Sequence, residues 1–165
     1  MNYLQIEKAS VANGPGVRVV LWVAGCKIHC RGCQNPESWD FYAGNPFDET
    51  AKYELFQALD KPYIRGLTIS GGNPLDRPYE IFRLVTEIKT KFPNKDIWLY
   101  SGYTYDEILS SRERFKALMG VDVLVDGPYI EEQRDITLAF RGSKNQRIID
   151  IKETWNKGEI VTIQN

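Results

Sequence analysis

The sequence lacks an apolar segment long enough to cross a membrane. Its longest apolar run, residues 17–24, contains Arg18 and falls far short of the roughly 20 apolar residues that a membrane-spanning helix requires. The first ten residues include Glu7 and Lys8, whereas a secretory signal has an apolar core at this place. We therefore expect a cytoplasmic protein with no membrane partner.

An excess of either charge is also missing. Lys and Arg number 21 and Asp and Glu number 22, which gives a formal net charge of −1. Proteins that bind nucleic acids usually carry a basic excess, because neutralising phosphates provides most of their affinity. No nucleic-acid partner is therefore expected. The length of 165 residues, of which 42% are apolar, suits a single domain that covers residues 1–165.

Cysteine is scarce, and its three copies all lie between positions 26 and 33. An odd and tightly clustered set indicates metal binding or redox chemistry rather than a disulfide framework. The spacing is Cys-x3-Cys-x2-Cys, and a compact loop at this spacing can bring Cys26, Cys30 and Cys33 together around one iron–sulfur cluster. Such clusters are normally held by four cysteines. One iron would therefore lack a protein ligand and could bind a small molecule.

Two other interpretations of the cysteines remain open. The three cysteines and His29 could form a structural zinc site in a non-catalytic interaction module. This arrangement is awkward, because His29 directly precedes Cys30 and both side chains would have to reach one tetrahedral ion. The thiols could also be inert or redox-active without a metal. His29 is interpreted as a loop residue near the site.

Apolar runs typical of strands alternate with segments typical of helices. Strands are expected at 17–24, 64–70, 97–100 and 121–125, with further short ones at 148–151 and 160–163. Asp48 is expected to cap a helix at 49–59, and Asp76 a second helix after it. Thr104 and Glu107 have the spacing of a capping box, which begins a third helix that ends near Gly120.

This alternation predicts βα units and an α/β fold with a parallel sheet. A complete eight-unit barrel takes about 250 residues, so the chain is expected to form an open, partial TIM-like barrel. The cysteine segment and the loops at 71–74, 101–103 and 126–129 all follow strands. Because the carboxyl ends of parallel strands meet at one edge, these loops are expected to form one site there.

The cysteine segment resembles the signature of the radical S-adenosylmethionine enzymes. More narrowly, GPGVR at 14–18, CQNPESW at 33–39, DGPY at 126–129 and RGSKNQR at 141–147 resemble motifs of glycyl-radical activating enzymes. The resemblance covers residues 1 to about 150 and is greatest to activating components of the anaerobic (class III) ribonucleoside-triphosphate reductases. It implies a [4Fe-4S] cluster on Cys26, Cys30 and Cys33, whose open iron binds S-adenosylmethionine.

The same resemblance implies a set of residues that contact S-adenosylmethionine. The backbone of Gly32, Cys33 and Gln34 would lie along the adenine. The loop of Gly71, Gly72, Asn73 and Pro74 would contact the methionine amino group, although Asn73 stands where an acid is usual. Ser101 and Asp126 would line the ribose or methionine end, or a monovalent cation site. Trp39 would pack against the cysteine loop.

The implied reaction is reductive cleavage of S-adenosylmethionine, which yields a radical that is passed to a backbone glycine of the reductase. Cofactors supply the difficult chemistry, so no side chain is expected to act as a catalytic acid or base. Electrons would come from a flavodoxin or ferredoxin, and a homodimer is compatible with the sequence. Activation of another glycyl-radical enzyme, such as pyruvate formate-lyase, is the alternative. Residues Arg141 to Arg147 form either a solvated loop or a partner contact.

Overall fold

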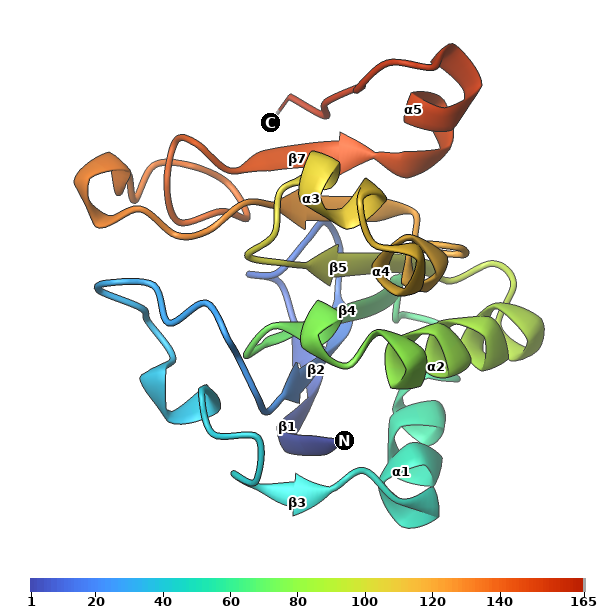
Figure 1. The fold of residues 1–165 in the computed structure, drawn as a ribbon. Coiled ribbons are helices and arrows are strands. Elements are labelled where there is room, and N and C mark those ends of the chain that lie inside the picture. Colours follow the sequence, from blue (N-terminus) through green and yellow to red (C-terminus); the bar gives the residue numbers. More distant parts are fainter. Residues whose placement is uncertain (165) are drawn as a thin grey trace.

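Seven strands form one mixed sheet in the computed structural model, which describes residues 1–164 (Figure 1). The strands are β1 (Asn2–Ser10), β2 (Arg18–Val23), β3 (Asn45–Pro46), β4 (Gly66–Gly71), β5 (Asp96–Tyr100), β6 (Val123–Asp126) and β7 (Arg147–Asp150), in the spatial order β3-β1-β2-β4-β5-β6-β7. The four central strands, β2, β4, β5 and β6, are parallel. The expected parallel centre of the α/β fold is therefore confirmed.

Both edges of the sheet differ from the expected pattern. Strand β1 was not predicted, and it pairs antiparallel with β2, while β7 pairs antiparallel with β6. The expected strand at 160–163 contributes only a bridge between Ile149 and Thr162. The repeated βα pattern thus stops after β6, and an open TIM-like barrel stays a prediction.

The helices are α1 (Glu49–Leu59), α2 (Pro78–Lys91), α3 (Tyr105–Leu109), α4 (Arg112–Ala117) and α5 (Ile151–Lys157). Asp48 caps α1 as expected, and the capping box of Thr104 and Glu107 is present. The third predicted helix is nevertheless two helices, because the Ser111 side chain accepts a hydrogen bond from the Arg114 N–H and begins α4. Serine favours such caps over helix interiors.

The expected role of Asp76 as a helix cap is wrong. Asp76 belongs to a short 3₁₀ turn (Pro74–Asp76), and Arg77 precedes α2 without a side-chain cap. Pro78 at the start of α2 suits the first helical turn, where no backbone N–H partner is needed. The Asp76 carboxylate instead accepts hydrogen bonds from the Lys27 N–H and the Tyr103 hydroxyl, which belong to two other loops.

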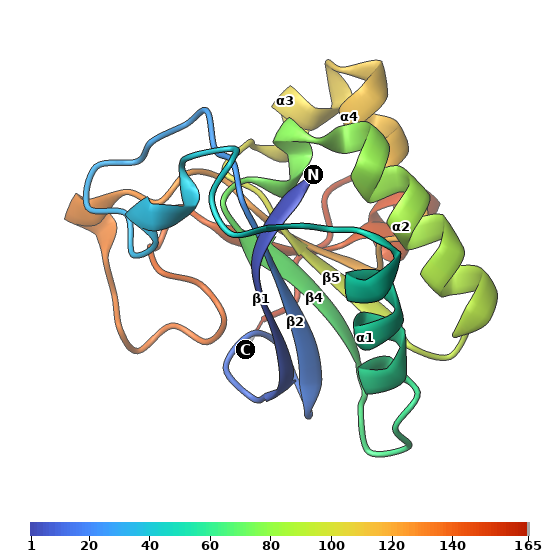
Figure 2. The ribbon, with the colours of Figure 1, turned by 90° about the horizontal axis from the view of Figure 1, so that it is seen from below.

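Alternation along the strands gives the sheet two different faces. Helices α1 to α4 cover one face (Figure 2), where apolar side chains such as Leu21, Ile69 and Leu99 form the main core. The opposite face carries buried polar side chains such as Thr68 beside a second, smaller apolar cluster that includes Trp98 and Val125. This second face continues into the site at the carboxyl ends of the strands.

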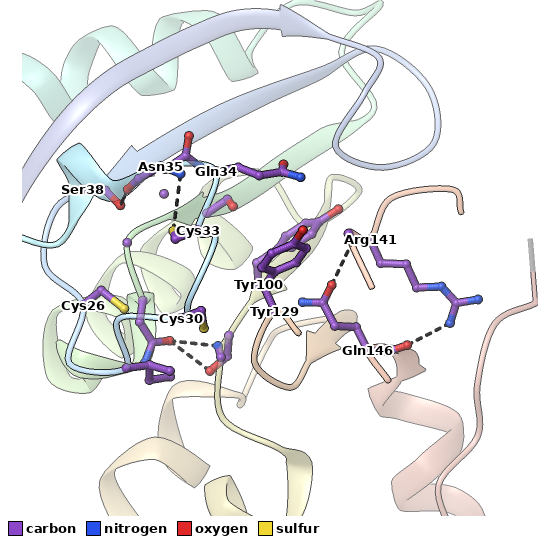
Figure 3. A pocket seen from close by; sticks show the side chains of 18 of the residues that line it. Cys26, Cys30, Cys33, Gln34, Asn35, Ser38, Tyr100, Tyr129, Arg141 and Gln146 are labelled. Carbon is purple, nitrogen blue, oxygen red and sulfur yellow. Dashed lines mark hydrogen bonds between the residues drawn. The ribbon is translucent and has the colours of Figure 1, made fainter. Parts of the chain in front are cut away.

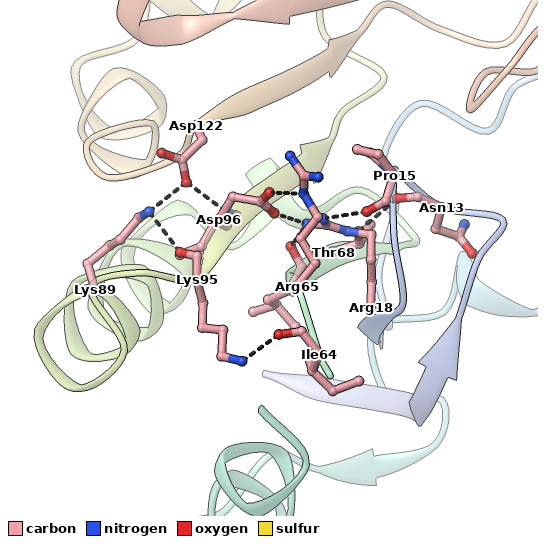
Figure 4. A network of polar contacts seen from close by, with 12 residues as sticks. Asn13, Pro15, Arg18, Ile64, Arg65, Thr68, Lys89, Lys95, Asp96 and Asp122 are labelled. Atoms are coloured by element: carbon pink, nitrogen blue, oxygen red, sulfur yellow. Dashed lines mark hydrogen bonds and ion pairs between the residues drawn. The ribbon is translucent and has the colours of Figure 1, made fainter. Parts of the chain in front are cut away.

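Arg18 lies buried on this second face, although it sits in the apolar run of β2. Its Nε donates to Thr68 Oγ1 at 2.8 Å and its Nη2 to the Leu67 carbonyl at 2.9 Å (Figure 4). Asp96 provides the countercharge, which Arg65 shares from the surface. A buried guanidinium needs such a complete set of acceptors. The motif at 14–18 therefore has a structural role in linking β2, β4 and β5.

Replacing Arg18 by leucine should destabilise the fold strongly. Arg18→Leu leaves its buried acceptors without a donor, and losses of about 3 kcal/mol are typical for one partner of a buried ion pair. Arg65→Leu is the matched control, because the mostly exposed Arg65 pairs with the same Asp96 and such pairs contribute about 0–1 kcal/mol. Anaerobic urea unfolding followed by circular dichroism measures both; equal losses would contradict a structural role for Arg18.

Candidate functional site

The loops that follow β2, β4, β5 and β6 lie at one edge of the sheet, as the sequence predicts (Figures 1 and 3). They enclose a pocket of about 450 Å³. From the predicted set, the pocket is lined by Cys26, Cys30, Cys33, Gln34, Gly71, Gly72, Asn73 and Ser101. Gly32 directly precedes the lining residue Cys33 but is not itself a lining residue, and neither are Pro74 and Asp126.

Backbone hydrogen bonds join the start of the cysteine loop to the segment at 38–39 that follows it. The N–H groups of Gly25 and Cys26 donate to the carbonyls of Ser38 and Trp39, at 2.8 and 3.1 Å. Gly25 has φ +100°, and a Cβ there would lie 2.2 Å from the Phe41 ring. Only glycine fits this close approach with a positive φ. The three thiols are free, partly buried and on one side of the pocket (Figure 3).

The electrostatics of the loop favour a bound cationic group. Burial raises the pKa of the Cys30 thiol, an effect that a hydrogen bond from the Tyr129 backbone opposes and that the charges of Cys26 and Cys33 increase. Three thiolates in this loop therefore repel one another in a partly desolvated setting. A cationic metal core bound by all three would remove this repulsion.

The described side chains do not form a closed single-metal site. Within residues 1–164, no three His, Cys, Asp or Glu side chains are grouped closely enough to hold one metal ion. A tetrahedral zinc site with Zn–S bonds of about 2.3 Å needs thiolates about 3.8 Å apart, whereas thiolates on different irons of a cluster stand further apart. His29 stacks on Trp39, with ring centroids 4.4 Å apart, as expected for a loop residue.

The glycine loop after β4 is bonded directly to the cysteine loop. The Gly72 N–H donates to the Val23 carbonyl and the Asn73 N–H to the Gly25 carbonyl, both at 2.8 Å. A Cβ at Gly72 would lie 2.4 Å from the Gly25 carbonyl oxygen. The paired glycines are therefore needed because two backbones touch here. This contact places two predicted cofactor-binding loops beside each other.

Asn73 is 2% exposed, and its side chain joins two loops. Its Nδ2 donates to Asp76 Oδ2 at 3.1 Å, and its Oδ1 accepts hydrogen bonds from Ser101 Oγ at 3.1 Å and from the Gly102 N–H at 3.4 Å. The amide thus has partners on both sides within the protein. Its contact with a ligand stays a prediction.

Asp126 is buried at the end of β6, one residue before the pocket-lining Gly127, and is paired with Arg147. Its carboxylate accepts hydrogen bonds from the Arg147 guanidinium and from the Tyr105 N–H, the latter at 2.7 Å. The hydrogen bond to Asp126 raises the pKa of Arg147, which keeps the guanidinium charged. The structure therefore gives Asp126 a protein partner, and its expected role beside a ligand or cation stays a prediction.

Side chains of the motif at 141–147 are hydrogen-bonded to the 126–129 loop, and a contact of this motif with a partner stays a prediction. Asn145 Nδ2 donates to the Pro128 carbonyl at 2.8 Å, and Gln146 Nε2 donates to the Gly127 carbonyl at 3.1 Å. Gln146 Oε1 also accepts from the Gly142 and Ser143 N–H groups. The motif therefore fixes the 126–129 loop, which supplies Gly127 and Tyr129 to the pocket.

Sequence reasoning missed several residues that line the pocket. Tyr100 ends β5 and donates from its hydroxyl to the Phe140 carbonyl at 2.6 Å. Asn13, from the loop between β1 and β2, and the segment at 134–142 also line it. Tyr100 could have been found from its place beside Ser101 at the end of a strand. No local signal indicates the other residues.

The chain matches the family model of the 4Fe-4S single cluster domain over residues 12–149. An iron–sulfur cluster domain is therefore the class that the fold and the cysteine loop define.

Similar proteins narrow this class. The chain is 42% identical over 153 residues to the anaerobic ribonucleoside-triphosphate reductase-activating protein of Haemophilus influenzae, covering 90% of this chain and 97% of that protein. The proteins of the same name from Enterobacteria phage T4 and Escherichia coli K12 are 43% and 37% identical, over 90% and 88% of this chain and 93% and 96% of their own lengths. The chain belongs to this family of activating proteins.

Loss of the Gln146 side-chain contacts should loosen the 126–129 loop. Gln146→Met keeps the length of the side chain but removes three hydrogen bonds, so we expect a loss of about 1–3 kcal/mol. Amide exchange at 127–130 and 141–146 should become faster by about tenfold. Lys144→Met is the control, because Lys144 is exposed and forms only a 3.7 Å ion pair with Asp135. Equal exchange in both variants would contradict the proposed contacts.

Proposed function

We propose that this chain is a radical S-adenosylmethionine activase that generates a glycyl radical on an anaerobic ribonucleoside-triphosphate reductase. The observation that carries the proposal is the meeting of three thiols and the Gly71–Gly72 backbone in one pocket. The names of the similar proteins support the same reductase as the target. Cys26, Cys30 and Cys33 would hold a [4Fe-4S] cluster, which supplies when bound one electron for the reductive cleavage of S-adenosylmethionine.

The residues of the chain would bind and orient the cofactor rather than transfer protons. Gly32 and Gln34 flank Cys33 and would present backbone to the adenine, while Gly71 and Gly72 would present backbone to the methionine end. Ser101 would stand beside them through its hydrogen bond to Asn73. Close approach of backbone to ligand is what paired glycines allow. The polar side chains of Asn73 and Asp126 would fix the loops, with direct ligand contact as their second proposed role.

No helix within residues 1–164 is long and apolar enough to span a membrane. We propose a cytoplasmic protein of one domain with a sheet curved as an open barrel, which would admit a loop of a large partner. A flavodoxin or ferredoxin would donate the electron, and a homodimer is compatible with the proposal.

Loss of any one cysteine should abolish cluster binding. Cys26→Ala, Cys30→Ala and Cys33→Ala each leave two thiolates for a cluster that already lacks a fourth cysteine, so iron and sulfide per chain should fall to background after anaerobic reconstitution. Lys27→Ala is the control within the same loop, because the Lys27 side chain is exposed. A cysteine variant that retains a full cluster would contradict the proposed ligand set.

The activity is tested by mixing the reconstituted protein with a reductant, S-adenosylmethionine and either anaerobic ribonucleoside-triphosphate reductase or pyruvate formate-lyase. We expect a glycyl radical signal in the electron paramagnetic resonance spectrum of the mixture that contains the reductase, and no such signal in the mixture that contains pyruvate formate-lyase. The signal should disappear when S-adenosylmethionine is left out. A radical on pyruvate formate-lyase only would replace the proposed target, and a radical on neither protein would contradict the activase function.

A further inference from the structure

Three loops around the pocket donate hydrogen bonds to one carboxylate, that of Asp76. The Lys27 N–H, in the cysteine loop, donates to Oδ2 at 2.8 Å, and Asn73 Nδ2 donates to the same oxygen at 3.1 Å. The Tyr103 hydroxyl, from the loop after β5, donates to Oδ1 at 2.6 Å. Asp76 ends the 3₁₀ turn that follows the glycine loop and is itself only partly exposed.

A carboxylate suits this position because all three neighbours act as donors. An ionised carboxylate offers acceptor sites on both oxygens and no competing donor, and hydrogen bonds to a charged acceptor are stronger than neutral ones. Burial and the hydrogen bond to Asp76 raise the pKa of Tyr103 to about 12. Tyr103 therefore remains a donor at neutral pH, and its ring is covered by the Arg114 guanidinium at 3.6 Å.

Asp76 also decides which way the Asn73 amide faces. The Asn73 Nδ2 group donates to Asp76, and the Asn73 Oδ1 atom accepts from Ser101 and Gly102. Only one orientation of the amide satisfies all of these partners. Without the carboxylate, the Nδ2 group would lose its partner in a site that is 2% exposed, and the amide could rotate. The hydrogen bond to Lys27 meanwhile fixes the cysteine loop one residue after Cys26.

We propose that Asp76 is a positioning residue, whose carboxylate sets the placement of the cysteine loop relative to the loop of Asn73 and thereby the binding of S-adenosylmethionine. Asp76 acts through Lys27 and Asn73 and is not placed in contact with the ligand. The part that concerns S-adenosylmethionine rests on the proposed function, whereas the part that concerns the two loops does not.

The test compares Asp76→Ala, Asp76→Asn and Tyr103→Phe in the cluster-reconstituted protein and in the metal-free chain. Two quantities are measured: amide exchange of residues 25–30, and the equilibrium dissociation constant for S-adenosylmethionine. In Asp76→Ala, exchange at Lys27 should rise and affinity should fall, each by about tenfold, as for one lost hydrogen bond to a charged group. Iron per chain should stay at the wild-type level, because all three cysteines remain.

The other two variants separate positioning from general stability. Asp76→Asn should restore slow exchange at Lys27, since its carbonyl can accept that N–H while its amide faces the Tyr103 oxygen. Tyr103→Phe removes the donor that belongs to neither of the two loops, so both quantities should change by less than about threefold. If Asp76→Ala fails to fold, the affinity of Asp76→Asn compared with wild type decides. The hydrogen bonds from Lys27 and Asn73 then end on a neutral oxygen and are weaker, so this variant should bind S-adenosylmethionine more weakly than wild type, and equal affinity would overturn the positioning role.

The outcomes distinguish the two proposals. Unchanged exchange and unchanged affinity in a folded Asp76→Ala variant would overturn the positioning role, as would an equal effect of Tyr103→Phe. If the wild-type protein binds no S-adenosylmethionine, the proposed function fails. Exchange at Lys27 in the metal-free chain then still decides whether Asp76 fixes the cysteine loop.

Discussion

The backbone contact between the start of the cysteine loop and the glycine loop is the constraint on which the site depends. Parallel pairing of β2 and β4 continues past the ends of the strands, through the bonds from Gly72 to Val23 and from Asn73 to Gly25. A side chain at Gly72 would separate the two backbones. The thiols, the glycine backbone and the polar side chains of the later loops are arranged around this contact, so one rigid edge organises the pocket.

Local signals were enough to predict the centre of the molecule and the core of the site. Apolar runs predicted the strands β2, β4, β5 and β6, and capping residues predicted where α1 and α3 begin. The cysteine spacing identified the metal-binding loop, which the match to a 4Fe-4S single cluster domain supports. The loops could be expected to meet because the carboxyl ends of parallel strands lie at one edge of a sheet.

Features set by distant partners could not be predicted in this way. Antiparallel pairing at both edges depends on which strands meet, and neither β1 nor β7 carries a local signal for it. Asp76 has the sequence pattern of a helix cap but is used by three loops up to 49 residues away. Gln146 likewise has an ordinary polar context, and only the fold brings it to the 126–129 loop. Arg18 appeared as an interruption of an apolar strand, yet it links three strands.

The central claim is that three thiols hold a cluster whose remaining iron is open to S-adenosylmethionine. The most direct measurement is the electron paramagnetic resonance spectrum of the anaerobically reconstituted and reduced protein, recorded with and without S-adenosylmethionine. We expect a [4Fe-4S]⁺ signal that changes when the compound is added. A signal that stays the same would contradict an open iron in contact with S-adenosylmethionine, and a protein that binds zinc and gives no iron signal would contradict the cluster itself.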